Sequence, residues 1–69
     1  MSPSVANIVV QIAAEASDTI SDTEAPRKKV LDGLVRLGFD EASISQTIIM
    51  AKDLGIIHER GTNLEIVGA

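Results

Sequence analysis

Residues with catalytic or metal-binding chemistry are few in this chain. His58 is the single histidine, and the sequence contains no cysteine, tryptophan or tyrosine. Glu59 and Glu65 are acidic residues that could approach His58, but a zinc site normally needs three or four strong ligands. The sequence also lacks a glycine-rich phosphate loop and the residue pattern of a Ser–His–Asp hydrolase. We therefore expect no enzymatic activity, no metal and no cofactor, and we interpret His58 as a solvent-facing residue of a strand.

Side chains that could contact nucleic acid are more numerous. Lysine and arginine bind phosphates, serine and glutamine can hydrogen-bond base edges, and an aliphatic side chain can touch a thymine methyl group. The candidate set is Lys28, Lys29, Ser43, Ser45, Gln46, Ile49, Lys52 and Arg60. Asp53 lies beside Lys52 and opposes its charge, and Lys28 with Lys29 could equally form a solvated face. The residue types alone therefore do not decide between these uses.

The segment 40–67 must position most of these side chains. Apolar residues recur in it at helical spacing, Asp40 or Ser43 can cap the start of the helix, and Gly55 suits its end. The following residues alternate like two short strands around a polar, glycine-containing turn. The sequence predicts a helix over about 41–54 and a β-hairpin over about 56–67.

Two further helices are expected before this segment. An apolar stripe with polar residues on the opposite side predicts a helix over about 4–17. A second is predicted over about 24–37, with Pro26 in its first turn, where a missing N–H group is tolerated. Gly33 lowers the helix propensity of this segment, and close approach of another helix is one explanation. We expect one α+β domain over residues 1–69.

The stretch ISQTIIMAKDLGII followed by HERGTNLEIV resembles the third helix and wing of winged helix-turn-helix domains. The resemblance is at the level of the superfamily and is strongest over residues 40–67. It implies three helices followed by a C-terminal β-hairpin, with a short strand before the second helix, for which Thr19–Ser21 is the candidate. It also implies sequence-specific DNA binding in transcriptional control. The third helix would read bases, and Arg60 at the tip of the wing would enter a minor groove.

Charge and composition restrict this interpretation. The net charge is −4; residues 1–24 contain four acidic and no basic residues, whereas residues 25–69 contain six of each. This distribution argues against indiscriminate nucleic-acid binding but leaves room for a locally positive face. Because one copy offers little positive surface, we expect a homodimer that doubles the phosphate contacts and reads two half-sites.

The cellular location is inferred from what the sequence lacks. No apolar run approaches the roughly 20 residues of a membrane span. The first residues have no basic region of the kind that opens a signal peptide. The absence of cysteine fits a reducing compartment, so we expect a cytoplasmic protein without a membrane partner.

The alternative is a protein-interaction module. Ile49 and Met50 lie on or near the outer face of the third predicted helix, and methionine adapts to varied binding surfaces. Met50 could instead pack beneath the hairpin. Val10 lies off the apolar stripe of the first helix, either as a scattered exposed aliphatic residue or as part of a dimer contact. With this function the chain would be a docking or dimerisation subunit, or a small inhibitor.

Overall fold

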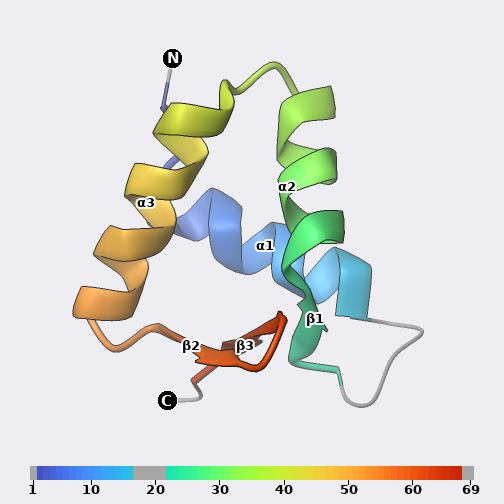
Figure 1. Ribbon diagram of the computed structural model, residues 1–69, viewed down its shortest axis with the longest axis vertical. Helices are drawn as coiled ribbons and strands as arrows, with labels where there is room; N and C mark the ends of the chain where they lie inside the picture. Colours follow the sequence, from blue (N-terminus) through green and yellow to red (C-terminus); the bar gives the residue numbers. More distant parts are fainter. Residues whose placement is uncertain (1, 17–21, 68–69) are drawn as a thin grey trace.

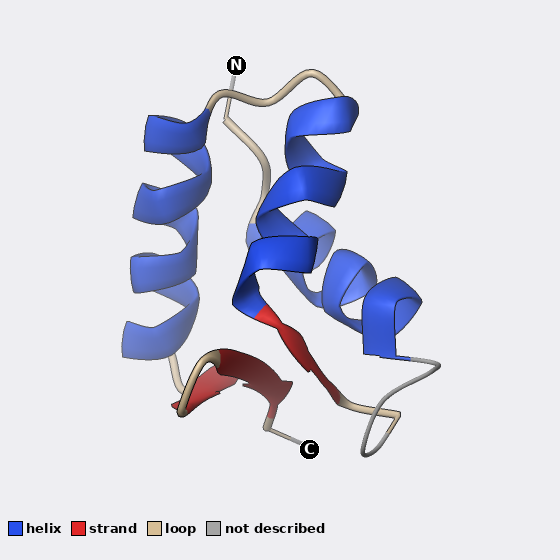
Figure 2. Cartoon of the chain, turned by 45° about the vertical axis from the view of Figure 1, so that its right-hand side comes forward, coloured by secondary structure: helices blue, strands red, loops and turns tan. Residues whose placement is uncertain are grey.

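The computed structural model describes residues 2–16 and 22–67 of the chain. Their elements, in order, are α1 (Val5–Ala16), β1 (Glu24–Pro26), α2 (Arg27–Arg36), α3 (Glu41–Asp53), β2 (Ile57–Arg60) and β3 (Asn63–Ile66). The strands form one antiparallel sheet in the order β1-β3-β2. Figures 1 and 2 show α2 and α3 standing side by side, α1 crossing behind them, and the sheet at one end of the helices. The predicted α+β class is confirmed.

Strand β3 holds the sheet together because it pairs with both other strands. Leu64 in β3 lies opposite Ala25 on one side and opposite Glu59 on the other. The pairing continues past β1, where the backbone N–H of Arg27 donates to the carbonyl of Thr62 at 3.0 Å. The sheet therefore joins the segment that precedes α2 to the hairpin that follows α3.

The second helix begins three residues later than the sequence predicts. The expected helix covered about 24–37, whereas Glu24–Pro26 forms β1 and the helix starts at Arg27. Pro26 is the N-cap residue, with φ −58° and ψ 132°, rather than a residue of the first turn. The residue before a proline favours extended backbone, and an edge strand tolerates the missing N–H, so pairing with β3 prevails over helix formation here. The candidate strand at Thr19–Ser21 lies outside the described residues.

The start and end of α3 follow the predicted chemistry. Asp40 caps the helix: one of its carboxylate oxygens accepts the N–H of Ser43 at 2.8 Å, and the other accepts the Ser43 hydroxyl at 3.0 Å. These hydrogen bonds, the backbone one first, hold the pKa of Asp40 below its ordinary value of 3.8. Gly55 follows the helix with φ 74°, a conformation that glycine adopts without steric cost. Local residues thus fix where this helix begins and ends.

The core is built from aliphatic side chains contributed by every helix and strand. The buried set is Ile8, Ile12, Ala16, Ala25, Val30, Leu34, Ile44, Ile48, Ala51, Ile57 and Leu64. Phe39, the one aromatic residue of the chain, is only partly buried and packs against this cluster. Because each element supplies one to three of these side chains, burial of apolar surface links all six elements together.

Gly33 allows α1 to approach α2 closely. A Cβ atom at this position would collide with the side-chain amide of Gln11 in α1, with the Gln11 Cδ only 2.7 Å away. The same amide donates to Glu15 at 3.0 Å, which keeps it over α2. The close approach suggested by a glycine within this helix is observed.

We expect Leu64→Ala to lower the free energy of unfolding by about 2–5 kcal/mol, because it removes a fully buried side chain from the central strand. Leu37→Ala is the matched control: Leu37 is 64% exposed, so its truncation should change stability by less than about 0.5 kcal/mol. Chemical denaturation measures both variants. If Leu64→Ala lowered the free energy of unfolding as little as Leu37→Ala, the packing of β3 against the helices would be contradicted.

Candidate functional site

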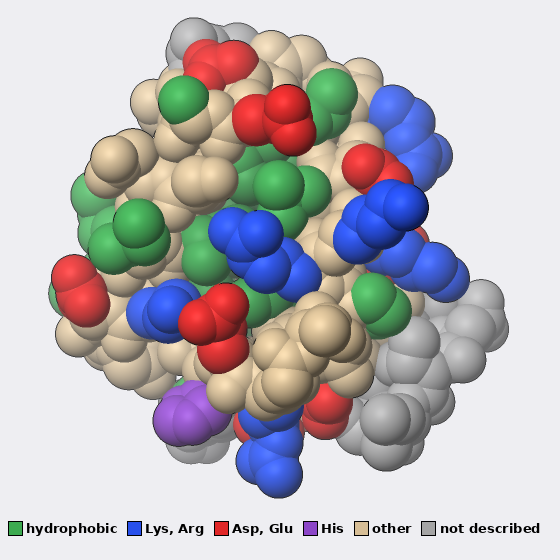
Figure 3. Space-filling model, viewed as in Figure 1, with side chains coloured by type: hydrophobic (Ala, Val, Ile, Leu, Met, Phe, Trp, Pro, Cys, Tyr) green, Lys and Arg blue, Asp and Glu red, His purple; other side chains and the backbone are tan. Residues whose placement is uncertain are grey.

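A groove of about 640 Å³ opens between α2, the start of α3 and the turn of the hairpin. Its lining residues are Pro26, Arg27, Lys28, Leu31, Asp32, Glu41, Gly61 and Thr62. Figure 3 shows hydrophobic side chains gathered in the hollow between α2 and α3, with Lys and Arg side chains over it and beside it. The pairing of β1 with β3 creates this groove because it places the start of α2 next to the hairpin turn.

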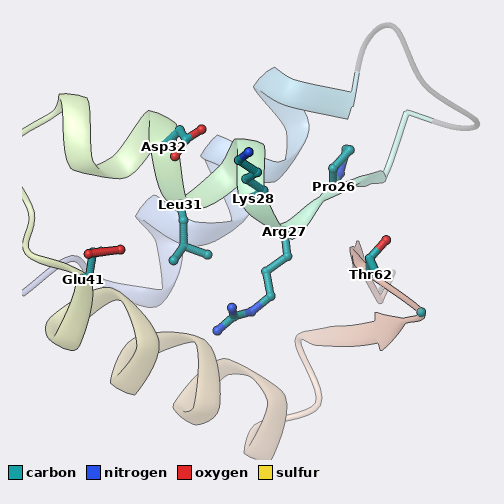
Figure 4. Close-up of a pocket in the computed structure, with 8 residues that line it drawn as sticks. Pro26, Arg27, Lys28, Leu31, Asp32, Glu41 and Thr62 are labelled. Carbon is teal, nitrogen blue, oxygen red and sulfur yellow. The ribbon is translucent and has the colours of Figure 1, made fainter.

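Arg27 is the cation at the centre of this groove. Figure 4 shows its side chain extending from the start of α2 into the space between α2 and α3, on the same side as Leu31. The residue is half-buried, and among the described residues its guanidinium forms neither a hydrogen bond nor an ion pair. A cation held partly out of water and without a carboxylate partner is suited to receive an anionic group.

Arg27 is not among the ligand-binding residues predicted from the sequence. The helix was expected to begin at residue 24, which placed Arg27 within its first turns rather than at its start. The signal that could have located it is the neighbouring Pro26, since a proline often stands at the boundary of a helix.

The start of α2 concentrates positive charge. The helix has no acidic residue in its first turn, and Pro26 supplies no side-chain cap. Arg27 is followed directly by Lys28 and Lys29, both of which are exposed. The N–H of Arg27 donates to the Thr62 carbonyl, and the helix dipole adds to the positive potential of these side chains. This end of α2 therefore favours anions such as phosphate.

Acidic residues confine the positive region to one end of the groove. Glu41 lines the groove from the start of α3, and Asp32 lies one turn beyond Lys28 on α2. Figure 4 shows Glu41 well separated from Arg27 along the groove. A ligand that fills the whole groove would meet charges of both signs, whereas a ligand at the start of α2 and the hairpin turn meets cations.

The predicted reading residues of α3 have different surroundings. Gln46 and Ile49 are exposed, whereas Ser45 is half-buried. Ser43 donates both its N–H and its hydroxyl to Asp40, so its polar groups already serve the cap. Fewer side chains of α3 are therefore free to contact a ligand than the sequence predicts.

Two of the predicted cations form ion pairs. Lys52 Nζ lies 2.6 Å from Glu59 Oε1 and ties α3 to β2, and Arg60 Nη1 lies 3.4 Å from Glu65 Oε1 in β3. The hydrogen bond from Lys52 is the main cause that lowers the pKa of Glu59 below its ordinary value of 4.5; the charge of Lys52 and, to a smaller extent, that of Arg27 add to it. Both pairs are partly exposed and hence weak. Lys52 and Arg60 can turn to a phosphate only by leaving these carboxylates.

The apolar residues of the alternative surface are open to solvent. Val10, Ile49 and Met50 are 65%, 50% and 55% exposed, and Leu54 beyond the end of α3 is 63% exposed. Packing of Met50 beneath the hairpin, one of the two interpretations of this residue, is therefore not observed. His58 is exposed in β2, as expected for a solvent-facing strand residue.

Neither a metal cluster nor a membrane-spanning helix is present in the described ranges. No group of three or more His, Cys, Asp or Glu side chains within residues 2–16 and 22–67 could hold a metal ion. No helix in those residues has the length and apolar character needed to cross a bilayer.

Comparison of the chain with protein-family models, curated proteins and solved structures found no match. The function must therefore be inferred from the groove, the exposed face of α3 and the charges around them.

The Lys52–Glu59 pair is expected to make stability depend on pH. The pKa of Glu59 is lower in the folded protein than in the unfolded chain, so its contribution is fully present above about pH 4.5 and is lost as the pH falls through the folded-state pKa. Glu59→Gln should flatten this part of the curve of unfolding free energy against pH. Lys52→Gln, which removes the partner, should flatten it similarly; an unchanged slope in either variant would contradict the pairing.

Proposed function

We propose that this protein is a small DNA-binding domain of the winged-helix type, which acts as a homodimer in transcriptional control in the cytoplasm. The element order and the sheet order β1-β3-β2 support the winged-helix assignment. In this assignment the hairpin of β2 and β3 is the wing, and α3 is the helix that enters a DNA groove.

The observation that carries the proposal is the basic start of α2. Arg27, Lys28 and Lys29 form an uninterrupted cationic segment at a helix start to which Pro26 adds no side-chain cap, and none of them is ion-paired within the described part of the chain. The hydrogen bond from Arg27 N–H to Thr62 fixes this segment beside the hairpin turn. A DNA phosphate backbone bound here would lie against both α2 and the hairpin. These contacts would fix the position of α3 along the DNA.

The exposed face of α3 supplies residues that can read bases. Gln46 can form paired hydrogen bonds with adenine, and Ile49 can contact a thymine methyl group. Ser45 would contribute from the edge of this face, since it is half-buried. Lys52 and Arg60 would also contact phosphates once they leave the carboxylates of Glu59 and Glu65.

The acidic residues explain why binding would be selective rather than general. Glu41 and Asp53 are exposed on α3, and the chain as a whole carries a charge of −4. Electrostatic attraction to any duplex is therefore small, and affinity depends on the fit of the local basic surface. A homodimer would provide two copies of this surface.

Replacing Lys28 and Lys29 together by Ala should weaken binding to every DNA sequence. Each lost phosphate contact is expected to reduce the slope of log affinity against log salt by about 0.9. Fluorescence anisotropy with random-sequence duplex DNA at low and moderate salt measures this slope.

Arg36→Ala is the matched control for these lysine changes, because it removes a basic residue from the other end of α2. We expect its salt slope to equal that of the wild type, whereas Gln46→Ala should alter sequence preference and leave the slope unchanged. Equal slopes for the lysine variant, the control and the wild type would contradict DNA docking at the start of α2.

A second candidate function is docking of a protein partner on α3. The exposed apolar side chains Ile49, Met50 and Leu54 favour it, because they lie within six positions at the end of α3 and methionine adapts to varied binding surfaces. In this case the basic start of α2 would orient an acidic partner, and no DNA binding would be measured.

Ile49→Asp distinguishes these candidates. Because Ile49 is half exposed, the variant should keep its fold, as measured by circular dichroism, and should lose association with a protein partner if α3 is a docking surface. If α3 reads DNA, the same change should lower affinity for the preferred duplex by more than about tenfold through repulsion of phosphates. An unchanged affinity would contradict the placement of α3 in a DNA groove.

A further inference from the structure

The groove between α2 and α3 contains an apolar surface that the proposed phosphate contacts do not use. Leu31 lines it, half-buried and packed against the aliphatic core. Figure 4 shows the Leu31 side chain pointing into the space between the two helices, on the same side as the Arg27 side chain. A phosphate group is hydrophilic and gains nothing from contact with such a surface. DNA bound at the start of α2 would therefore leave this part of the groove without a ligand.

The size and lining of the groove are those of a small-molecule site. Its volume is about 640 Å³, and ligand pockets usually measure roughly 300–1,000 Å³. Such pockets combine apolar surface with a few polar groups that orient the ligand. In this groove Leu31 supplies apolar surface, and the guanidinium of Arg27 supplies a polar group beside it.

The charge of Arg27 favours a carboxylate as the orienting group of the ligand. Arg27 has no ion-pair partner among the described residues. Its charge acts weakly on Glu59, whose pKa it lowers, but Glu59 Oε1 is already bonded to Lys52 Nζ at 2.6 Å. A guanidinium binds a planar carboxylate through two parallel hydrogen bonds, which are strong where the cation is partly withdrawn from water.

Acidic residues limit the ligand to one negative charge. Glu41 lines the groove well away from Arg27, and Asp32 lies on α2 one turn beyond Lys28. A second anionic group that reached toward Glu41 would be repelled. The part of the ligand that extends from Arg27 along the groove must therefore be free of negative charge, and Leu31 favours an apolar group there.

We propose that this groove binds a small monocarboxylic acid, whose carboxylate pairs with Arg27 and whose apolar body covers Leu31. Binding of the acid goes beyond the proposed function and needs no DNA. One consequence rests on that function: Arg27 belongs to the basic segment that would meet DNA, so the acid and the duplex would compete for it. The acid would thus release the protein from DNA.

The test titrates the isotope-labelled full chain with octanoate and, separately, with 3-phenylpropanoate in the absence of DNA, followed by NMR. Octanamide keeps the apolar body without the charge, and inorganic phosphate keeps a negative charge without the body. We expect at least one of the two acids to shift the Arg27 Nε–H and Leu31 methyl resonances. Its dissociation constant should be lower than those of octanamide and phosphate by about tenfold or more, because only the acid uses both parts of the site.

Two variants locate the site. Arg27→Gln should raise the dissociation constant of the acid by about tenfold or more, to that of the amide, because it removes the guanidinium. Its backbone N–H still donates to Thr62, and circular dichroism verifies the fold. Arg36→Gln is the matched control, because it removes the same charge from the other end of α2. We expect this control to bind the acid as the wild type does.

Three results would overturn the inference: no shift at Arg27 or Leu31 with either acid, binding of phosphate or octanamide as tight as that of the acids, or unchanged binding of the acid to Arg27→Gln. None of these measurements contains DNA, so they decide the ligand site whether or not the protein binds DNA.

The competition with DNA is measured separately, by fluorescence anisotropy with random-sequence duplex DNA. At a concentration of about ten times its dissociation constant, the acid should weaken DNA binding by about tenfold. Unchanged DNA affinity in the presence of bound acid would overturn the competition and leave the ligand site supported. A protein that binds the acid but no DNA would contradict the proposed function alone.

Discussion

The pairing of β3 with both β1 and β2 is the constraint on which the rest of the structure depends. Leu64, fully buried in this central strand, lies opposite a residue of each neighbouring strand and packs into the aliphatic core. A two-stranded hairpin is marginally stable alone, and the third strand with the helices supplies the missing burial. Because β1 runs directly into α2, the same pairing fixes the start of that helix beside the hairpin turn.

This placement determines how charge is distributed over the surface. Arg27, Lys28 and Lys29 gather at one end of α2, while Lys52 and Arg60 are held by Glu59 and Glu65. The chain is acidic overall, yet the cations at the start of α2, which form no ion pair among residues 2–16 and 22–67, lie together beside the groove. Behind α2 and α3, the exposed residues of α1 are uncharged, namely Ala6, Asn7, Val10, Ala13 and Ala14. Two surfaces of different chemistry are thus separated by a single aliphatic core.

Local signals made much of the fold predictable from sequence. Asp40 and Gly55 act through neighbouring atoms, so the bounds of α3 could be inferred from residue type, and Gly33 indicated the contact with α1. The pairing of β1 with β3 joins residues about forty positions apart and could not be inferred from local pattern. That pairing shortens α2 and brings Arg27 to the groove. The hydrogen bonds of Ser43 to Asp40 and the ion pair of Lys52 with Glu59 could not be inferred either, because they depend on how the side chains are placed in three dimensions.

The most direct test of the basic surface is amide NMR of the isotope-labelled protein, titrated with a short random-sequence DNA duplex at low salt. We expect the largest chemical-shift changes at residues 27–29, at Gln46 and at Thr62, because the start of α2, the face of α3 and the hairpin turn would meet the same duplex. Amides of α1 should shift least. An absence of shifts at residues 27–29, with or without changes elsewhere, would contradict the proposed site.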